Sequence, residues 1–238
     1  MVVDLELRRA WTLDLADDRA SWAVFDEVCR RHREPIRRYH GLAHVLHVLR
    51  SVAELLSSNP VPDPGVIRLA AWFHDIVYDP RSSTNEHDSA ALARNRLTAL
   101  GVSEARVDEV ERLILLTQHG AAARAAGPAR APAGDAAAAG CGSGDDFDDP
   151  AAAVLLDADL AVLAAEPAVY EAYRHGVRSE HAHVTPDAWR TGRAAVLQSF
   201  LDRGHLFMTE AMREREAVAR TNLAAELAVL RRIEPPAR

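Results

Sequence analysis

Apolar residues recur at intervals of three and four along most of the chain, and no stretch alternates in the manner typical of a β-strand. This spacing places the apolar side chains on one face of an α-helix. It therefore predicts an all-α protein, a single irregular helical bundle spanning residues 1–238. The expected helices cover residues 21–32, 42–56, 66–78, 83–100, 103–118, 150–163, 168–178, 186–201 and 209–232.

Residues with known preferences for helix ends mark several boundaries. Pro64 suits the first turn of the helix that runs to about residue 78. Ser83 and Glu86 have the spacing of a capping box, in which the two side chains and the backbone cap each other. Gly101 ends the helix that they open. N-caps are also expected at Ser103, Asp149 and Thr185.

The segment at about 120–149 differs from the rest, because it consists mainly of Ala, Gly, Pro and Asp with hardly a large apolar residue. A segment of this composition cannot bury enough apolar surface to fold on its own. We expect a mobile loop inserted between two helices. Nothing else in the pattern indicates a second domain.

Composition narrows the function classes. The net charge is −7 and no basic block is present, which argues against nucleic acid as an obligate partner. The chain contains no lysine, so Schiff-base and P-loop lysine chemistry are excluded. The two cysteines lie far apart, and no signal peptide or membrane-spanning apolar run is apparent. We therefore expect a cytoplasmic protein without a membrane partner, whose oligomeric state is open.

A histidine stripe lies at the start of the second predicted helix. His40, His44 and His47 are spaced by four and three residues, so they would share a face if the helix extends back through Gly41. A lone helical histidine is more often structural than functional, and this ordinary reading is favoured for His47. For His40 the two readings are balanced.

A His-Asp doublet lies in the next apolar run, at His74 and Asp75. Adjacent residues on a helix point about 100° apart, so the two side chains would reach a common ion only from opposite flanks. Imidazole and carboxylate are nonetheless the groups that hold a catalytic divalent metal. Burying them without a partner is costly, which favours a functional explanation.

Four motifs in this order resemble the HD-domain superfamily and, more narrowly, a bacterial group of predicted metal-dependent HD phosphohydrolases. The match covers roughly residues 36–119 and 150–230, and the inserted loop falls between them. The motifs are Tyr39-His40…His44, Trp72-Phe73-His74-Asp75…Tyr78-Asp79, Asn85-Glu86…Ser89-Ala90 and Leu156-Asp157-Ala158-Asp159-Leu160, and Ala219-Arg220-Thr221-Asn222-Leu223 is also similar. The resemblance implies a helical bundle of the HD-domain type.

The resemblance also implies a ligand set for a divalent metal ion, which could be Mn, Co, Ni, Mg, Fe or Zn. The expected ligands are His44, His74, Asp75 and Asp159. Asp157 is the rival for the last position, because the two aspartates would point in different directions. His40 and His119 are candidates for a second metal or for substrate contact, although His119 could equally serve as a cation at a helix C-terminus.

The proton-transfer and phosphate-binding groups are less defined. Asp79 follows the doublet by one turn, where some HD hydrolases carry an acidic pair, but Tyr78 replaces the other acid. Glu86 is the second candidate for acid-base catalysis, and its capping-box spacing offers a purely structural alternative. The candidates for phosphate binding are Arg38, Arg178 and Arg193. The ordinary alternative is that each is a solvent-exposed or salt-bridged helix arginine.

The expected function is that of a metal-dependent phosphohydrolase acting on a small phosphoester such as a nucleotide through metal-activated water. Two alternatives stay open. One is a di-iron oxygenase on the same scaffold, which would need a second metal site. The other is a regulatory module that binds metal without catalysis.

Overall fold

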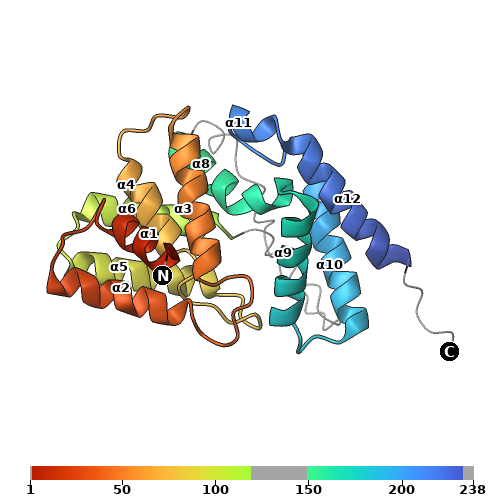
Figure 1. Ribbon diagram of the computed structural model, residues 1–238, viewed down its shortest axis with the longest axis horizontal. Helices are drawn as coiled ribbons and strands as arrows, with labels where there is room; N and C mark the ends of the chain where they lie inside the picture. The colour runs from red at the N-terminus through yellow and green to blue at the C-terminus, as the bar shows by residue number, and fades with distance from the viewer. Residues whose placement is uncertain (1, 119–148, 233–238) are drawn as a thin grey trace, which may run out of the picture.

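A computed structural model describes residues 2–118 and 149–232, which fold into helices and turns without any strand (Figure 1). The predicted all-α class is therefore confirmed. The helices are α1 (Val2–Trp11), α2 (Arg19–Arg31), α3 (Leu42–Leu56), α4 (Pro64–Phe73), α5 (Asn85–Ala99), α6 (Glu104–Leu116), α8 (Pro150–Leu160), the 3₁₀ helix η2 (Ala161–Ala164), α9 (Pro167–Glu180), α10 (Pro186–Leu201), α11 (Glu210–Arg213) and α12 (Glu216–Arg232).

Several predicted helix ends are confirmed by their capping geometry. The Asp149 carboxylate accepts hydrogen bonds from the first free amides of α8, and Thr185 does the same for α10. Gly101 follows α5 with a φ of 75°, a conformation that residues with a Cβ rarely adopt. Apart from Asp149, the predicted loop at 120–149 lies outside the described residues.

Four other boundaries differ from the prediction. Helix α1 was not expected, and α4 ends at Phe73 instead of about residue 78. The prediction of a capping box at Ser83 and Glu86 is wrong, because α5 begins at Asn85 with Thr84 as its N-cap. The last predicted helix is two helices, α11 and α12, separated by a turn at residues 214–215.

An aromatic cluster fixes α1, α2 and α4 against one another. The Trp11 ring meets Phe25 and Trp72 edge-on, at centroid distances of 5.5 and 5.2 Å. Its indole nitrogen donates to the Ser21 hydroxyl at 2.8 Å, so the polar edge of this buried ring is also satisfied. Helix α3 packs on α4 and α8, and this packing brings the ends of three helices together.

The helices form two groups in Figure 1. One contains α1 to α6, and the other contains α9, α10 and α12, with α8 and η2 between them. Helix α12 packs along α10 and crosses η2, where the Asn222 side chain donates to the Leu163 and Ala165 carbonyls. In the described part of the chain, every helix is too short or too polar to cross a lipid bilayer.

Candidate metal centre

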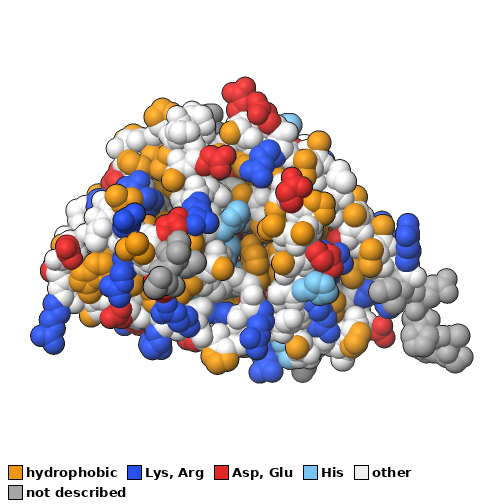
Figure 2. Space-filling model, in the orientation of Figure 1, with side chains coloured by type: hydrophobic (Ala, Val, Ile, Leu, Met, Phe, Trp, Pro, Cys, Tyr) orange, Lys and Arg blue, Asp and Glu red, His pale blue; other side chains and the backbone are white. Residues whose placement is uncertain are grey.

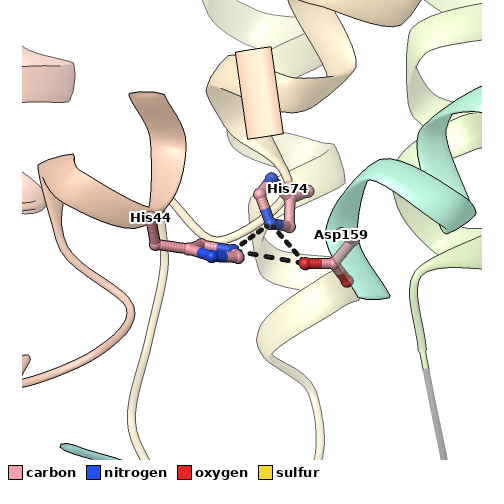
Figure 3. A group of neighbouring side chains, drawn as sticks. All are labelled: His44, His74 and Asp159. Carbon is pink, nitrogen blue, oxygen red and sulfur yellow. Dashed lines mark hydrogen bonds and ion pairs between the residues drawn. The ribbon is translucent and has the colours of Figure 1, made fainter. Parts of the chain in front are cut away.

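Two histidines and an aspartate from three helices meet at the junction of the two groups (Figure 3). His44 lies in the first turn of α3, His74 directly after α4, and Asp159 in the last turn of α8. Their donor atoms all lie within 4.8 Å of one another. The Nε2 atoms of the histidines are 3.1 Å apart, and Asp159 Oδ1 lies 3.2 and 3.6 Å from those of His44 and His74.

Asp75 approaches the same two nitrogens. Its Oδ2 lies 3.5 Å from His44 Nε2 and 3.3 Å from His74 Nε2. Helix α4 stops at Phe73, His74 occupies the C-cap position and Asp75 follows in a turn. The two adjacent side chains nevertheless converge, since Asp75 Oδ2 lies 3.3 Å from His74 Nε2.

The spacing of these donors fits a single divalent ion. Two atoms bound at about 2.1 Å to one ion lie about 3.0 Å apart at a right angle and about 3.4 Å apart at a tetrahedral angle. The separations within the His44, His74 and Asp159 group range from 3.1 to 3.6 Å. Both histidine side chains are buried, whereas about one-sixth of each aspartate side chain is exposed. The site therefore reaches solvent on its carboxylate side.

Secondary contacts orient His74 for metal binding. Its Nδ1 lies 3.0 Å from the Ala71 carbonyl oxygen, which can only accept, so Nδ1 carries a proton. A neutral His74 ring consequently presents the Nε2 lone pair to the site, which is the arrangement typical of metal-bound histidines. His44 Nδ1 is buried, and no described residue is hydrogen-bonded to it.

The close approach of these side chains shifts the pKa values of His74 and Asp75. Burial lowers the pKa of His74, but the Asp75 and Asp159 carboxylates outweigh it, so this pKa lies well above its ordinary range. Burial raises the pKa of Asp75, yet the neighbouring His74 and His40 shift it below the ordinary value. Two carboxylates thus create a strongly cation-binding environment around two imidazoles.

His40 lies beside this group but is held differently. Helix α3 begins at Leu42, as predicted, after the N-cap Gly41. His40 therefore lies in the preceding turn, and the condition under which it would share a helix face with His44 is not met. The His40 Nδ1 donates to the Glu180 carboxylate at 2.7 Å. Its ring centroid lies 5.5 Å from that of His44.

Glu180 is a site residue that the sequence analysis missed. Its Oε1 accepts the backbone amides of Arg38, Tyr39 and His40 at 2.7–3.0 Å, and its Oε2 accepts the Tyr78 hydroxyl at 2.8 Å. It stands at the end of α9, where the helix dipole disfavours an acid, and this is the one local signal that could have drawn attention to it.

Close packing brings α9 to the turn that Glu180 holds. At Gly176, an added Cβ would lie 3.0 Å from the Tyr39 Cβ and 3.3 Å from the Arg38 carbonyl oxygen. The absence of a side chain therefore allows the helix to approach the residues before His40. The bound turn then leads directly into the α3 helix that carries His44.

Arg37 is a second residue that was missed. Its buried guanidinium donates to the His40 and Asp75 carbonyls at 2.9 and 2.7 Å and to the Ile76 carbonyl at 3.0 Å. It therefore ties the turn before α3 to the turn after α4. The Asp75 and Ile76 carbonyls lie beyond the end of α4 and accept no helical hydrogen bond. The Arg37 guanidinium supplies the donors that a continuing helix would have provided.

The two aspartates of α8 have separate environments. Asp157 is buried and points away from the histidines, where it accepts the Met208 and Thr209 amides and the Thr209 hydroxyl at 2.7–3.1 Å. The structure therefore does not bring Asp157, the alternative ligand, to the histidines. Among the described residues, Asp159 is the α8 carboxylate that approaches the histidines.

His47 and the two acid-base candidates lie outside the donor group. His47 is half-buried one turn after His44, and burial lowers its pKa. Asp79 is exposed, and its carboxylate accepts the Arg81 amide within its own turn. Glu86 is buried in the first turn of α5. The structure therefore gives Asp79 a turn-stabilising contact and does not bring it to the metal ligands.

The three phosphate candidates also have different surroundings. Arg178 donates to the His181 and Val184 carbonyls after α9 and lies over the Trp189 ring. Arg193 is buried against Glu226, with Nε–Oε1 and Nη2–Oε2 distances of 2.8 and 3.1 Å. Both arginines are thus engaged in the fold. Arg38 is exposed, and its backbone amide is fixed two residues before His40.

The space-filling view shows histidine surface at the middle of one face, between the two helix groups (Figure 2). His119 lies outside the described residues. No protein-family model, curated protein or solved structure matches this chain.

Proposed function

We propose that this protein is a metal-dependent phosphohydrolase of the HD type that acts on a small phosphoester. The observation that carries the proposal is the meeting of His44, His74 and Asp159, with Asp75 beside them, at separations that suit one divalent ion. The resemblance in the sequence motifs supports the same conclusion, because its four expected ligands come from three separate segments and lie within about 3.6 Å of a common pair of histidine nitrogens.

The side chains divide the work of such a site. A divalent ion held there would activate water and polarise a phosphoryl oxygen. Asp75 and Asp159 supply two negative charges that favour a divalent over a monovalent cation. The Ala71 carbonyl keeps the His74 lone pair directed at the ion, and the exposed edges of both carboxylates leave an approach for the substrate.

The substrate's charge needs a basic partner outside the metal ligands. Of the three arginines that the sequence suggested, Arg38 is the exposed one, and its guanidinium makes no hydrogen bond or ion pair with another described residue. It precedes His40 by two residues in the turn held by Glu180. We assign it to phosphate binding, where its guanidinium can pair with two phosphoryl oxygens.

The first experiment measures metal and activity in the same preparations. Wild-type protein is analysed for bound metal by mass spectrometry and assayed with Mn²⁺, Co²⁺, Ni²⁺ and Mg²⁺ against a panel of nucleotides and simple phosphoesters. We expect Asp75→Ala and Asp159→Ala to lose both the ion and the activity. Asp157→Asn is the matched control, because it alters a carboxylate two residues from Asp159 and should keep the ion.

Three outcomes would overturn the proposal. Full metal occupancy without turnover of any phosphoester argues for a regulatory metal-binding module. Two irons per chain with an oxygen-dependent spectrum argue for the di-iron oxygenase. Unchanged metal content in Asp159→Ala shows that the cluster is not the metal centre.

A further inference from the structure

The Tyr39 side chain is fixed on several sides beside the candidate metal centre. Its backbone amide donates to Glu180 Oε1 at 2.7 Å. Helix α9 closes directly against it, since a Cβ added at Gly176 would lie 3.0 Å from the Tyr39 Cβ. The ring meets the Tyr173 ring edge-on at 4.7 Å, and its centroid lies 4.9 Å from that of His44. The direction of the hydroxyl is therefore set by packing.

This hydroxyl is buried, and no described residue is hydrogen-bonded to it. The two neighbouring tyrosines of α9 differ in this respect. The Tyr170 hydroxyl donates to Glu226 Oε2 at 2.7 Å, and the Tyr173 hydroxyl accepts from Arg193 Nη2 at 3.2 Å. A buried hydroxyl without a partner is costly, so the position of Tyr39 calls for an explanation other than packing.

The surrounding charges show which way the hydroxyl points. Burial raises the pKa of Tyr39 well above its ordinary value, and Tyr173, Asp159, Asp75 and Glu180 raise it further, in that order of strength. Electrostatic influence falls with distance. Both aspartates outweigh Glu180, although Glu180 is bonded to the Tyr39 backbone amide. The hydroxyl therefore lies on the side of the aspartates beside His44 and His74, away from Glu180.

The partner that suits this hydroxyl is an acceptor held at the metal centre. The hydroxyl is closed to bulk water, whereas about one-sixth of the Asp75 and Asp159 side chains is exposed. A ligand that reaches the centre past these carboxylates can bring an acceptor to the phenol. A phosphoryl oxygen fits, because hydrogen bonds to a charged acceptor are the stronger kind and offset the cost of burying the donor.

We propose that Tyr39 is a substrate-binding residue whose hydroxyl donates a hydrogen bond to a phosphoryl oxygen of the substrate at the metal centre. This inference rests on the proposed hydrolase function and adds a neutral donor to it. Arg38 and Tyr39 are consecutive in the turn held by Glu180, so the exposed guanidinium and the buried hydroxyl would bind one phosphate from two sides.

Phosphate binding tests this role without requiring turnover. Tyr39→Phe keeps the ring and removes only the hydroxyl. Tyr170→Phe is the matched control, because it removes a buried tyrosine hydroxyl from α9 that is bonded to Glu226. Each protein is loaded with one equivalent of Mn²⁺ and titrated calorimetrically with inorganic phosphate. We expect the dissociation constant to rise about 10- to 100-fold in Tyr39→Phe and to stay unchanged in Tyr170→Phe.

Urea unfolding in the presence of a chelator should order the same variants differently. Tyr170→Phe leaves the buried Glu226 without a donor, so its midpoint should fall below that of the wild type. Tyr39→Phe removes a hydroxyl that has no described partner, so its midpoint should stay unchanged or rise. A merely structural hydroxyl cannot give weaker phosphate binding together with undiminished stability.

Three results would overturn the inference. An unchanged phosphate dissociation constant in Tyr39→Phe shows that the hydroxyl does not contact the phosphoryl group. A fall in its urea midpoint as large as that of Tyr170→Phe shows a structural partner. Loss of Mn²⁺ in Tyr39→Phe shows that the hydroxyl serves the ion and not the substrate. The expected weakening of phosphate binding, in a wild type that turns over no phosphoester, supports this inference and overturns the hydrolase proposal alone.

Discussion

Asp157 and Asp159 are separated by one residue, and we expect their replacement by alanine to have opposite consequences. Asp157 is 1% exposed and accepts the Met208 amide, the Thr209 amide and the Thr209 hydroxyl. These contacts anchor the start of α11, which Thr209 caps. Asp157→Ala should therefore destabilise the fold and leave the metal centre intact, whereas Asp159→Ala should do the reverse.

The size of the effect follows from which donors lose their partner. Thr209 is 4% exposed, so its amide and its hydroxyl would both be left buried without the carboxylate. Each unsatisfied buried donor costs about 1–3 kcal/mol, and the half-buried Met208 amide can turn to water instead. We expect a loss of about 3 kcal/mol, a large part of the roughly 5–15 kcal/mol that stabilises a domain.

Urea unfolding followed by circular dichroism measures this loss. A chelator in every sample removes the contribution of bound ions. The midpoint of Asp157→Ala should fall by roughly 1–2 M, from the usual dependence of unfolding free energy on urea. Asp159→Ala should stay closer to the wild type. The reasoning is refuted if Asp157→Ala unfolds at the wild-type urea concentration, or if the folded variant fails to bind metal that the wild type binds.

Three further predictions concern buried groups. Glu226→Ala leaves the buried Arg193 guanidinium without its carboxylate, so urea titration should show a loss of about 3–5 kcal/mol, and a loss below about 1 kcal/mol would contradict this. Burial raises the pKa of Glu180, but the His40 contact and the backbone amides outweigh it and lower this pKa to about 2. The carboxylate therefore stabilises the fold above its ordinary pKa of 4.5 and loses this effect as pH falls toward 2. The difference in unfolding free energy between wild type and Glu180→Gln should narrow over that interval. Urea titrations at stepped pH measure it. A constant difference would speak against it. Burial raises the pKa of the Cys29 thiol to about 11, so in a Cys141→Ser background an aromatic disulfide reagent at pH 8 should modify Cys29 only as fast as the protein unfolds, and rapid modification of folded protein would disprove this.

Helix positions could be predicted because the apolar spacing depends on neighbouring residues. The end of α4 could not, because it depends on a distant one. Arg37 binds the Asp75 and Ile76 carbonyls from 38 and 39 residues earlier in the chain. The apolar pattern itself continues to Tyr78, so nothing local indicates that the helix stops at Phe73.

The ligand residues of the candidate site could be predicted, but the contacts that depend on distant segments could not. The resemblance of the four motifs implied the histidines and aspartates that meet, since spacing alone did not select them. The two-residue spacing in α8 implied that Asp157 and Asp159 point in different directions. Which of them faces the histidines depends on how α8 packs against α3. Glu180 reads as an ordinary helical charge, because its role comes from amides 140–142 residues away.

That separation sets the order in which the site is completed during protein synthesis. The residues proposed to hold the metal all lie on segments up to α8, whereas Glu180 ends α9 and leaves the ribosome later. A nascent chain can thus gather its cation ligands while the ring of His40 is still free to rotate. Glu180 can bind the amides of residues 38–40 only after α9 has emerged and docked, so an unfinished polypeptide can already gather the side chains proposed to bind the metal.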